Sequence, residues 1–228
     1  MLPYRPLAGV IPCPGGWLVA SGKLQGITLS PEAPTRCRTL IDVLDYKPAF
    51  EVIALAAPVG LLDEYRPGGR TCEREARRLL GPRRGSAIIS APARAVLKED
   101  SELLGVSAVA RRRLPHVRET ATELQPYWQR TVYEVHPELS FYQLNGDQPL
   151  QWSKHRVIGR KERRELLEAR LPGIGRILDS RIDGIREFHL LDAAACLWTA
   201  RRIAARAVQR LPEDPEWDSE GIRMELVR

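Results

Sequence analysis

The sequence lacks several features that would assign it to a familiar class of protein. It contains no CxxC pair, and no apolar run approaches the roughly 18 residues of a membrane span. The proline-broken N-terminus has no secretory hydrophobic segment, so we expect a cytoplasmic protein without a membrane partner. The cysteines are too far apart for a zinc framework, and we expect four reduced thiols. They are Cys13, Cys37, Cys72 and Cys196.

Motifs of the common nucleotide-binding and hydrolytic proteins are also missing. The chain has no GxxxxGK[ST] loop, no GxGxxG turn after a strand, no GxSxG turn and no HExxH helix. His136 and Glu138 alone are too few ligands for a zinc ion. A function must therefore be argued from the fold and from individual charged residues.

The charge of the chain is positive but moderate. Its 228 residues include 35 Lys and Arg against 29 Asp and Glu, which gives a net charge of +6. This balance permits a polyanionic partner but is lower than in proteins that coat DNA. Arginines occur in runs, and a basic helix face is predicted beside the apolar face of residues 71–80. It consists of Arg70, Arg74, Arg77 and Arg78.

The spacing of apolar and turn-forming residues predicts a mixed α/β fold. A turn at Gly22–Lys23 is expected between the second and third strands, and Thr35 is the expected cap of the first helix. The predicted strands are 7–11, 17–21, 24–29, 51–57, 131–135 and 222–227. The predicted helices are 35–46, 71–80, 161–171 and 190–208.

This order of elements favours an RNase H-like sheet flanked by helices. Such a sheet has three antiparallel strands followed by parallel strands that alternate with helices. We expect residues 1–228 to form a single domain, in which the arginine-rich region 61–126 is a helical insertion.

Seven strings along the chain resemble those of the DUF429 family of predicted RNase H-like nucleases. The strings keep the family's order from residue 9 to about residue 227. They are GVIPCPGGW at 9–17, ALAAPVGL at 54–61, TCEREARRLLG at 71–81, RRGS to APARAVL at 83–97, YEVHPE at 133–138 with Ser140 and Phe141, Ser153–Lys154 with Gly159 and Glu162–Arg163, and LDA to WTAR at 191–201.

The resemblance implies hydrolysis of phosphodiester bonds with two divalent metal ions. Magnesium prefers six hard oxygen ligands, so three or four carboxylates must converge at such a site. In this chain the family's first two aspartate positions are Ile11 and Ala56, and a later acid pair corresponds to Phe188 and His189. The residues that remain are Glu134, His136, Glu138 and Asp192.

We therefore predict a catalytically degenerate RNase H-like protein that binds a nucleic acid or a protein partner. Glu134 and Asp192 are residual site residues, weak candidates for Mg²⁺ or Mn²⁺, and no cofactor is expected. Each also has a structural interpretation. Asp192 is then a helix N-cap or a buried hydrogen-bonding residue, and Glu134 belongs to a network with His136 and an arginine. The phosphate-binding candidates are Arg83, Arg84, Arg94 and Lys154.

Two other functions stay open at this point. In the first, Glu134, Glu138 and Asp192 hold one metal ion in a nuclease, with His136 or His189 as the general base. In the second, the chain is a structural subunit of a larger assembly, which predicts a contiguous exposed apolar patch. The sequence does not decide the oligomeric state.

Overall fold

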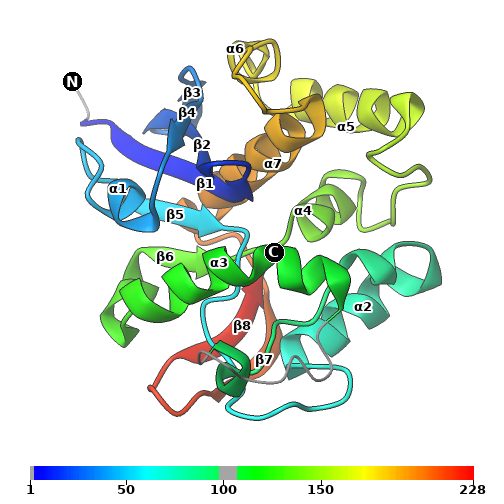
Figure 1. Cartoon of the computed structure of the whole chain (residues 1–228). Coiled ribbons are helices and arrows are strands. Elements are labelled where there is room, and N and C mark those ends of the chain that lie inside the picture. The colour runs from blue at the N-terminus through cyan, green and yellow to red at the C-terminus, as the bar shows by residue number, and fades with distance from the viewer. Residues whose placement is uncertain (1–2, 98–106) are drawn as a thin grey trace.

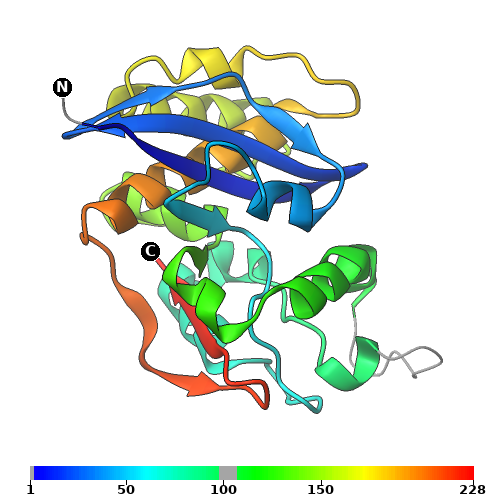
Figure 2. The ribbon, with the colours of Figure 1, turned by 90° about the vertical axis from the view of Figure 1, so that its left-hand side faces the viewer.

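The structure is a computed structural model that describes residues 3–97 and 107–228. Figures 1 and 2 show a curved sheet with helices on both sides and a second, smaller layer that contains a hairpin. The strands are β1 (Arg5–Cys13), β2 (Gly16–Gln25), β3 (Thr28–Pro31), β4 (Thr35–Cys37), β5 (Val52–Leu55), β6 (Val132–Glu134), β7 (Arg210–Trp217) and β8 (Arg223–Val227). The helices are α1 (Leu40–Leu44), α2 (Thr71–Arg84), α3 (Ala108–Glu123), α4 (Pro137–Leu144), α5 (Val157–Arg170), α6 (Gly175–Leu178) and α7 (Glu187–Ala204).

The main sheet has the strand order β3-β2-β1-β5-β6, and β4 also pairs with β2. β1, β2 and β3 pair antiparallel, whereas β5 is parallel to both β1 and β6. The predicted fold class, a mixed sheet flanked by helices, is thus confirmed. Its strand order is consistent with an RNase H-like fold.

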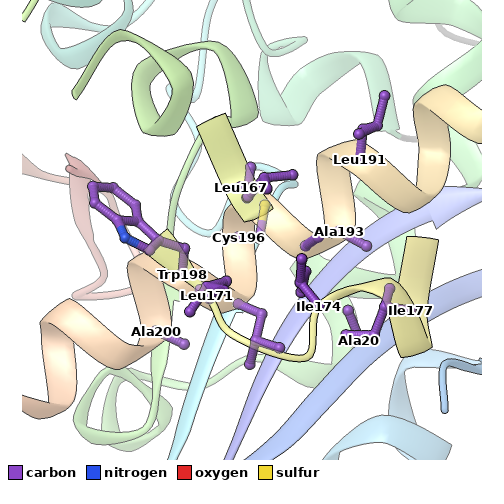
Figure 3. Packing of buried hydrophobic residues seen from close by; sticks show 14 of the residues in the cluster. Ala20, Leu167, Leu171, Ile174, Ile177, Leu191, Ala193, Cys196, Trp198 and Ala200 are labelled. Atoms are coloured by element: carbon purple, nitrogen blue, oxygen red, sulfur yellow. The ribbon is translucent and has the colours of Figure 1, made fainter. Parts of the chain in front are cut away.

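The main core lies between one face of the sheet and α7. At Gly9 on β1 the helix comes so close that a Cβ atom would lie 2.1 Å from the Leu197 nitrogen. Only glycine leaves room for this contact. Leu167 of α5 and Ile177 of α6 belong to the same core as the apolar residues of α7, and both side chains are fully buried (Figure 3). α5 and α6 therefore form the outer layer over α7.

The opposite face of the sheet carries a second core, which includes Val10, Trp17, Leu40 and Leu124. α2 packs against β7 and β8, as Figure 1 shows. In the part of the chain that the structure describes, no helix is both long and apolar enough to cross a membrane. All four cysteines are free and buried, as expected for thiols.

Two local predictions in the first fifty residues are wrong. Gly22–Lys23 lies inside β2, and the chain turns instead at Gly26, which adopts a φ of 59°. The segment predicted as a helix over 35–46 starts as β4 on the sheet. The helix begins only after Thr39, because the side chain of Thr39 and that of Asp42 cap each other's backbone N–H groups.

The sequence also fails to indicate β7. Pro212 and Pro215 interrupt the alternation that identifies a strand, and the pairing with β8 shifts register between Leu211 and Glu216. The predicted strand at the C-terminus is confirmed as β8. The pairing of the proline-containing strand β7 with β8 can therefore be recognised only in the structure.

Candidate functional site

Asp192, the acid expected on the late helix, lies in the second turn of α7 and is 5% exposed. Its Oδ2 atom accepts a hydrogen bond from the ammonium of Lys154, which lies in the loop before α5. The other oxygen, Oδ1, is buried and has no hydrogen-bond partner. A divalent cation at this carboxylate would have to compete with an ammonium that the fold already supplies.

The loop that carries Lys154 is fixed by a buried arginine. Arg163 on α5 is fully buried and donates hydrogen bonds to the carbonyls of Trp152 and Gly159, each at 2.9 Å. It also donates to the Glu138 carboxylate at 2.7 Å. A Cβ at Gly159 would lie 2.1 Å from a loop carbonyl, so the helix and the loop are in direct contact. Glu138 therefore positions the Lys154 loop through Arg163.

Glu134 lies at the end of β6 and pairs with Arg70, which immediately precedes α2. Arg70 donates to the two carboxylate oxygens at 2.5 and 2.7 Å, and the Val59 backbone N–H donates at 2.8 Å. Arg70 also bonds Glu73 and the Gly60 carbonyl. Of the alternative network of Glu134 with His136 and an arginine, the structure contains the arginine, whereas His136 accepts the backbone N–H of Glu138 instead. Arg70 was expected on an exposed face, but it is 2% exposed.

Glu134 and Asp192 do not meet. Residues alternate along a strand, and Glu134 shares a face of β6 with Val132, which packs in the core opposite α7. Ile11 belongs to the core beneath α7, and Ala56 packs against that core. The carboxylates therefore point to different parts of the molecule, and apolar side chains fill the space of the missing acids.

These residues do not fit a pair of divalent metal ions. Two of the expected oxygen-ligand positions are apolar, and each retained acid is bonded to its own lysine or arginine. Within residues 3–97 and 107–228, no group of three or more His, Cys, Asp or Glu side chains is arranged to hold a metal ion. No hydrolytic step can therefore be assigned to them through such ions.

His136 caps α4 and lies close to the cations of this region. Its Nδ1 atom accepts the backbone N–H of Glu138 at 3.2 Å. Burial, together with the positive charges of Arg113 and Lys154, lowers the pKa of His136 to about 3. The ring is neutral at physiological pH, and its Nδ1 lone pair is already used. His136 therefore cannot act as a general base through its Nδ1 atom.

His189 has a similar environment at the start of α7. Its Nδ1 atom accepts the backbone N–H of Arg186 at 3.0 Å. Burial lowers the pKa of His189 to about 4, and Lys154 and Arg186 contribute in the same direction. Both histidines are thus neutral and close to several cations. We name Lys154, Asp192, His136, His189 and Arg113 the Lys154 cluster.

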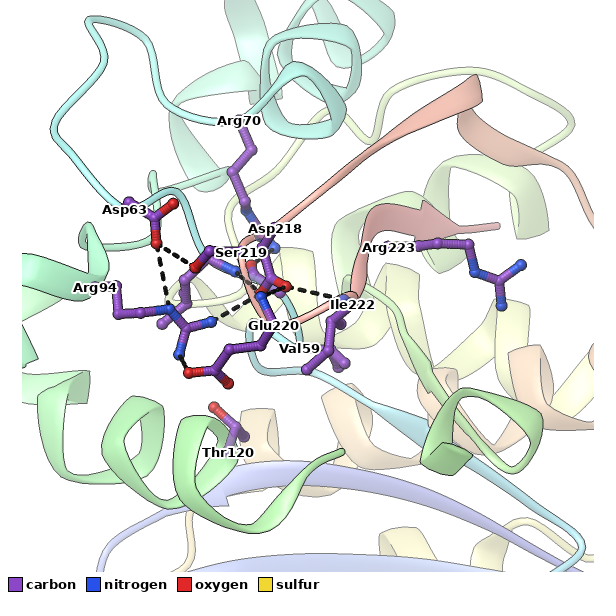
Figure 4. Close-up of polar contacts among 12 residues, drawn as sticks. Val59, Asp63, Arg70, Arg94, Thr120, Asp218, Ser219, Glu220, Ile222 and Arg223 are labelled. Carbon is purple, nitrogen blue, oxygen red and sulfur yellow. Dashed lines mark hydrogen bonds and ion pairs between the residues drawn. The ribbon is translucent and has the colours of Figure 1, made fainter. Parts of the chain in front are cut away.

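Arg94, a phosphate-binding candidate, lies elsewhere and is already paired. Figure 4 shows its guanidinium among three carboxylates, at 2.6 Å from Glu220, 2.8 Å from Asp218 and 3.6 Å from Asp63. Asp218 is fully buried on its side chain and also accepts the Ile222 backbone N–H. This arrangement ties the 218–222 turn to the loop that carries Asp63.

The other two arginine candidates, Arg83 and Arg84, lie in the last turn of α2. Arg84 donates to the carbonyls of Leu150 and Gln151, at 3.1 and 3.4 Å, and so supports the segment that leads to Lys154. Arg83 is exposed, beyond a kink at Gly81 where φ is 64°. Of the four phosphate-binding candidates, Lys154 is the one that contacts a predicted site acid.

Sequence reasoning missed Arg70, Arg113 and Arg163 as parts of this arrangement. Arg163 had a recognisable signal, since Gly159, Arg163 and Leu167 recur at every fourth residue on the buried face of α5. An arginine at such a position requires a buried acid. The pattern itself does not say which acid, and only the fold identifies Glu138.

Comparison with models of known protein families finds a match. The model of a family described as "Protein of unknown function (DUF429)" matches residues 9–217, which is nearly the whole chain. No curated protein and no solved structure gives a significant match.

Proposed function

The chain belongs to the DUF429 family, and we propose that it binds the phosphate backbone of a nucleic acid at the Lys154 cluster instead of cleaving it with two metal ions. One observation carries the proposal. The Lys154 ammonium bonds Asp192, the acid of the late helix, and so supplies a fixed positive charge there.

The remaining acids support the same interpretation. Glu134 bonds Arg70, and Glu138 bonds Arg163, so neither has a free carboxylate to contribute to a metal ion. Removing one partner of such a buried pair would leave an uncompensated charge, which is strongly unfavourable. The acids therefore act in structure and not as ligands.

The charges that remain near the surface are mostly positive. Lys154 is 24% exposed on its side chain, Arg113 on α3 is exposed, and Arg186 follows at the start of α7. Phosphate groups are bound by Lys and Arg through charge-assisted hydrogen bonds, and such binding does not require base recognition. A polyanionic strand suits this region better than a cationic or neutral ligand.

The two other candidate functions have less support. A one-metal nuclease would need Glu134, Glu138 and Asp192 together, but each is bonded to a different cation. A structural subunit would need a contiguous apolar patch. Within residues 3–97 and 107–228, the large exposed apolar side chains come from many elements, and only Val157 and Ile158 are neighbours in sequence.

The proposal is tested by titrating the protein with fluorescent 20-nucleotide DNA and RNA at several salt concentrations. We expect salt-dependent binding that Arg113→Ala weakens roughly threefold, since one phosphate contact is lost. Arg112→Ala, a change at the neighbouring exposed arginine on α3, is the matched control and leaves the affinity unchanged. Equal effects of both variants would contradict a defined site.

A second variant acts in the opposite direction, which misfolding cannot imitate. Asp192→Asn removes the negative charge beside Lys154 and is expected to tighten binding roughly threefold. The same samples are incubated with Mg²⁺ or Mn²⁺ and examined for cleavage products. Metal-dependent cleavage that disappears in Asp192→Asn or Glu134→Gln would overturn the proposal, and so would the absence of salt-dependent binding.

A further inference from the structure

Aromatic side chains from two segments surround Lys154. His155 follows it in the loop, and Phe188 lies at the start of α7 with its ring centroid 5.2 Å from that of His155. The Lys154 ammonium lies 5.6 Å from the centre of the Phe188 ring. Phe188 also contacts His189 at a centroid distance of 4.1 Å. The cation of the site is thus bordered by a group of touching rings.

The loop that contains Lys154 also carries an arginine beside a tryptophan ring. The Arg156 guanidinium lies 5.5 Å from the centre of the Trp152 ring, and Arg156 and His155 are both exposed. Trp152 and Phe188 are each half-buried, so they support the exposed groups from below. We name Trp152, His155, Arg156 and Phe188 the aromatic rim.

We infer that the aromatic rim takes unpaired bases, so that the strand bound at the Lys154 cluster is single-stranded nucleic acid. This inference rests on the proposed function and adds the class of ligand. Sequence-tolerant binding of single strands combines cations that follow the backbone with aromatic rings and arginines on which bases stack. Here Lys154 supplies the cation, and the aromatic rings and the arginine come from its own loop and from the start of α7.

A duplex cannot use the rim in the same way. Its bases are paired and stacked inside the helix, so their faces do not reach a protein side chain without being unstacked. Its phosphates can still reach Lys154 and Arg113. The two parts of the site therefore predict different behaviour, since the cluster serves either form and the rim serves single strands alone.

The chain contains a matched aromatic control outside the site. Trp217 at the end of β7 is 63% exposed and has the Arg223 guanidinium 5.9 Å from its ring centre. This pair has the same chemistry as Trp152 and Arg156 but lies on the β7–β8 hairpin. A variant at Trp217 removes an exposed ring without touching the loop of Lys154.

The test compares Phe188→Leu, His155→Ala and Trp217→Ala in titrations with 20-nucleotide oligo(dT), oligo(U) and a 20-base-pair duplex. The wild-type chain is expected to bind a single strand about tenfold more tightly than the duplex, because one or more stacked bases contribute. Phe188→Leu keeps an apolar side chain at this half-buried position, and His155→Ala changes an exposed side chain, so both should fold. Each is expected to weaken single-strand binding about tenfold and to leave duplex binding unchanged.

Three outcomes separate this inference from the proposed function. Duplex binding as tight as single-strand binding, with Arg113→Ala still weakening both, overturns the inference and leaves the proposed function intact. Weakening by Trp217→Ala equal to that of Phe188→Leu overturns the inference as well, since an aromatic side chain outside the rim would then contribute as much to binding as one within it. A chain that binds neither form overturns both.

Discussion

The Arg70 anchor and the Lys154 cluster both join an acid of the predicted site to a cation, yet they differ in completeness. We define the Arg70 anchor as Arg70, Glu73 and Glu134, which are all at least 94% buried. Each of its carboxylates also accepts a backbone N–H, and none of its side-chain polar atoms is without a partner. In the Lys154 cluster the lysine is partly exposed, and one oxygen of Asp192 has no hydrogen bond.

The two groups differ in whether their polar atoms still have capacity to bind a further partner. A buried charge network that is fully satisfied holds segments together, here α2, β6 and the loop at Val59. An exposed cation beside an incompletely bonded carboxylate still has the capacity to interact with a ligand. The acids of the predicted site can therefore have different environments within one chain.

The largest expected effect comes from breaking the Arg70 anchor. Arg70→Ala leaves two carboxylates buried without a cation and is expected to lower the free energy of unfolding by about 3–5 kcal/mol, measured by urea denaturation. Arg66→Ala, which removes an exposed pair with Glu216, is the control, with a loss of about 1 kcal/mol at most. If Arg70→Ala does not fold, Arg70→Lys keeps the charge and gives a smaller loss. A loss in Arg70→Ala no larger than that of the control would contradict a structural role.

An intermediate effect is expected from the neutral histidine of the Lys154 cluster. The pKa of His136 is about 3 in the folded chain, and an unfolded histidine titrates near its usual 6.5. Between these values the unfolded state binds the additional proton, so acidification from pH 6.5 lowers stability by at most about 1.4 kcal/mol per pH unit. His136→Asn keeps the cap of α4 and should reduce this slope.

The slope is measured as the free energy of unfolding at intervals from pH 7 to pH 4. His155→Asn, a change of an exposed ring, is the control and should leave the slope of the wild-type chain. If His136→Asn and the control have the same slope, His136 is not held neutral by its surroundings. The contrast between anchor and cluster would then have to rest on the carboxylates alone.

The smallest effect is expected at Arg94, which is itself partly exposed and whose partners Asp63 and Glu220 are exposed, whereas Asp218 is buried. Arg94→Ala should lower the free energy of unfolding by about 1 kcal/mol, because Asp218 keeps its backbone hydrogen bonds. Nucleic-acid affinity, measured beside Arg113→Ala, should not change. Equal weakening of binding by both variants would extend the phosphate-binding surface to the 218–222 turn.

Much of the fold could be predicted because local patterns carry it. The buried run before Pro58, the glycine at position 9 and the long apolar helix each restrict what the chain can form, and their order implies the mixed sheet. The errors are local. Thr35 and Thr39 are both capable caps, and only the pairing of 35–37 with β2 decides between them.

The candidate site could be predicted only in part. The sequence singles out Glu134, Glu138, Asp192 and Lys154, but it treats arginines as exposed by default. Arg70 and Arg163 are buried instead, because each meets a carboxylate that is distant in sequence. Such pairs cannot be found from spacing along the chain.

By itself, the sequence determined which acids the chain has and which it lacks, since the side chains of Ile11 and Ala56 carry no atom that can bind a metal ion. Only the tertiary structure decided what the retained acids do. A carboxylate is a ligand, a cap or half of an ion pair depending on which cation the fold brings within about 3 Å, and the interaction weakens steeply beyond that distance. For Asp192 that cation is Lys154, placed there by a loop that is anchored elsewhere.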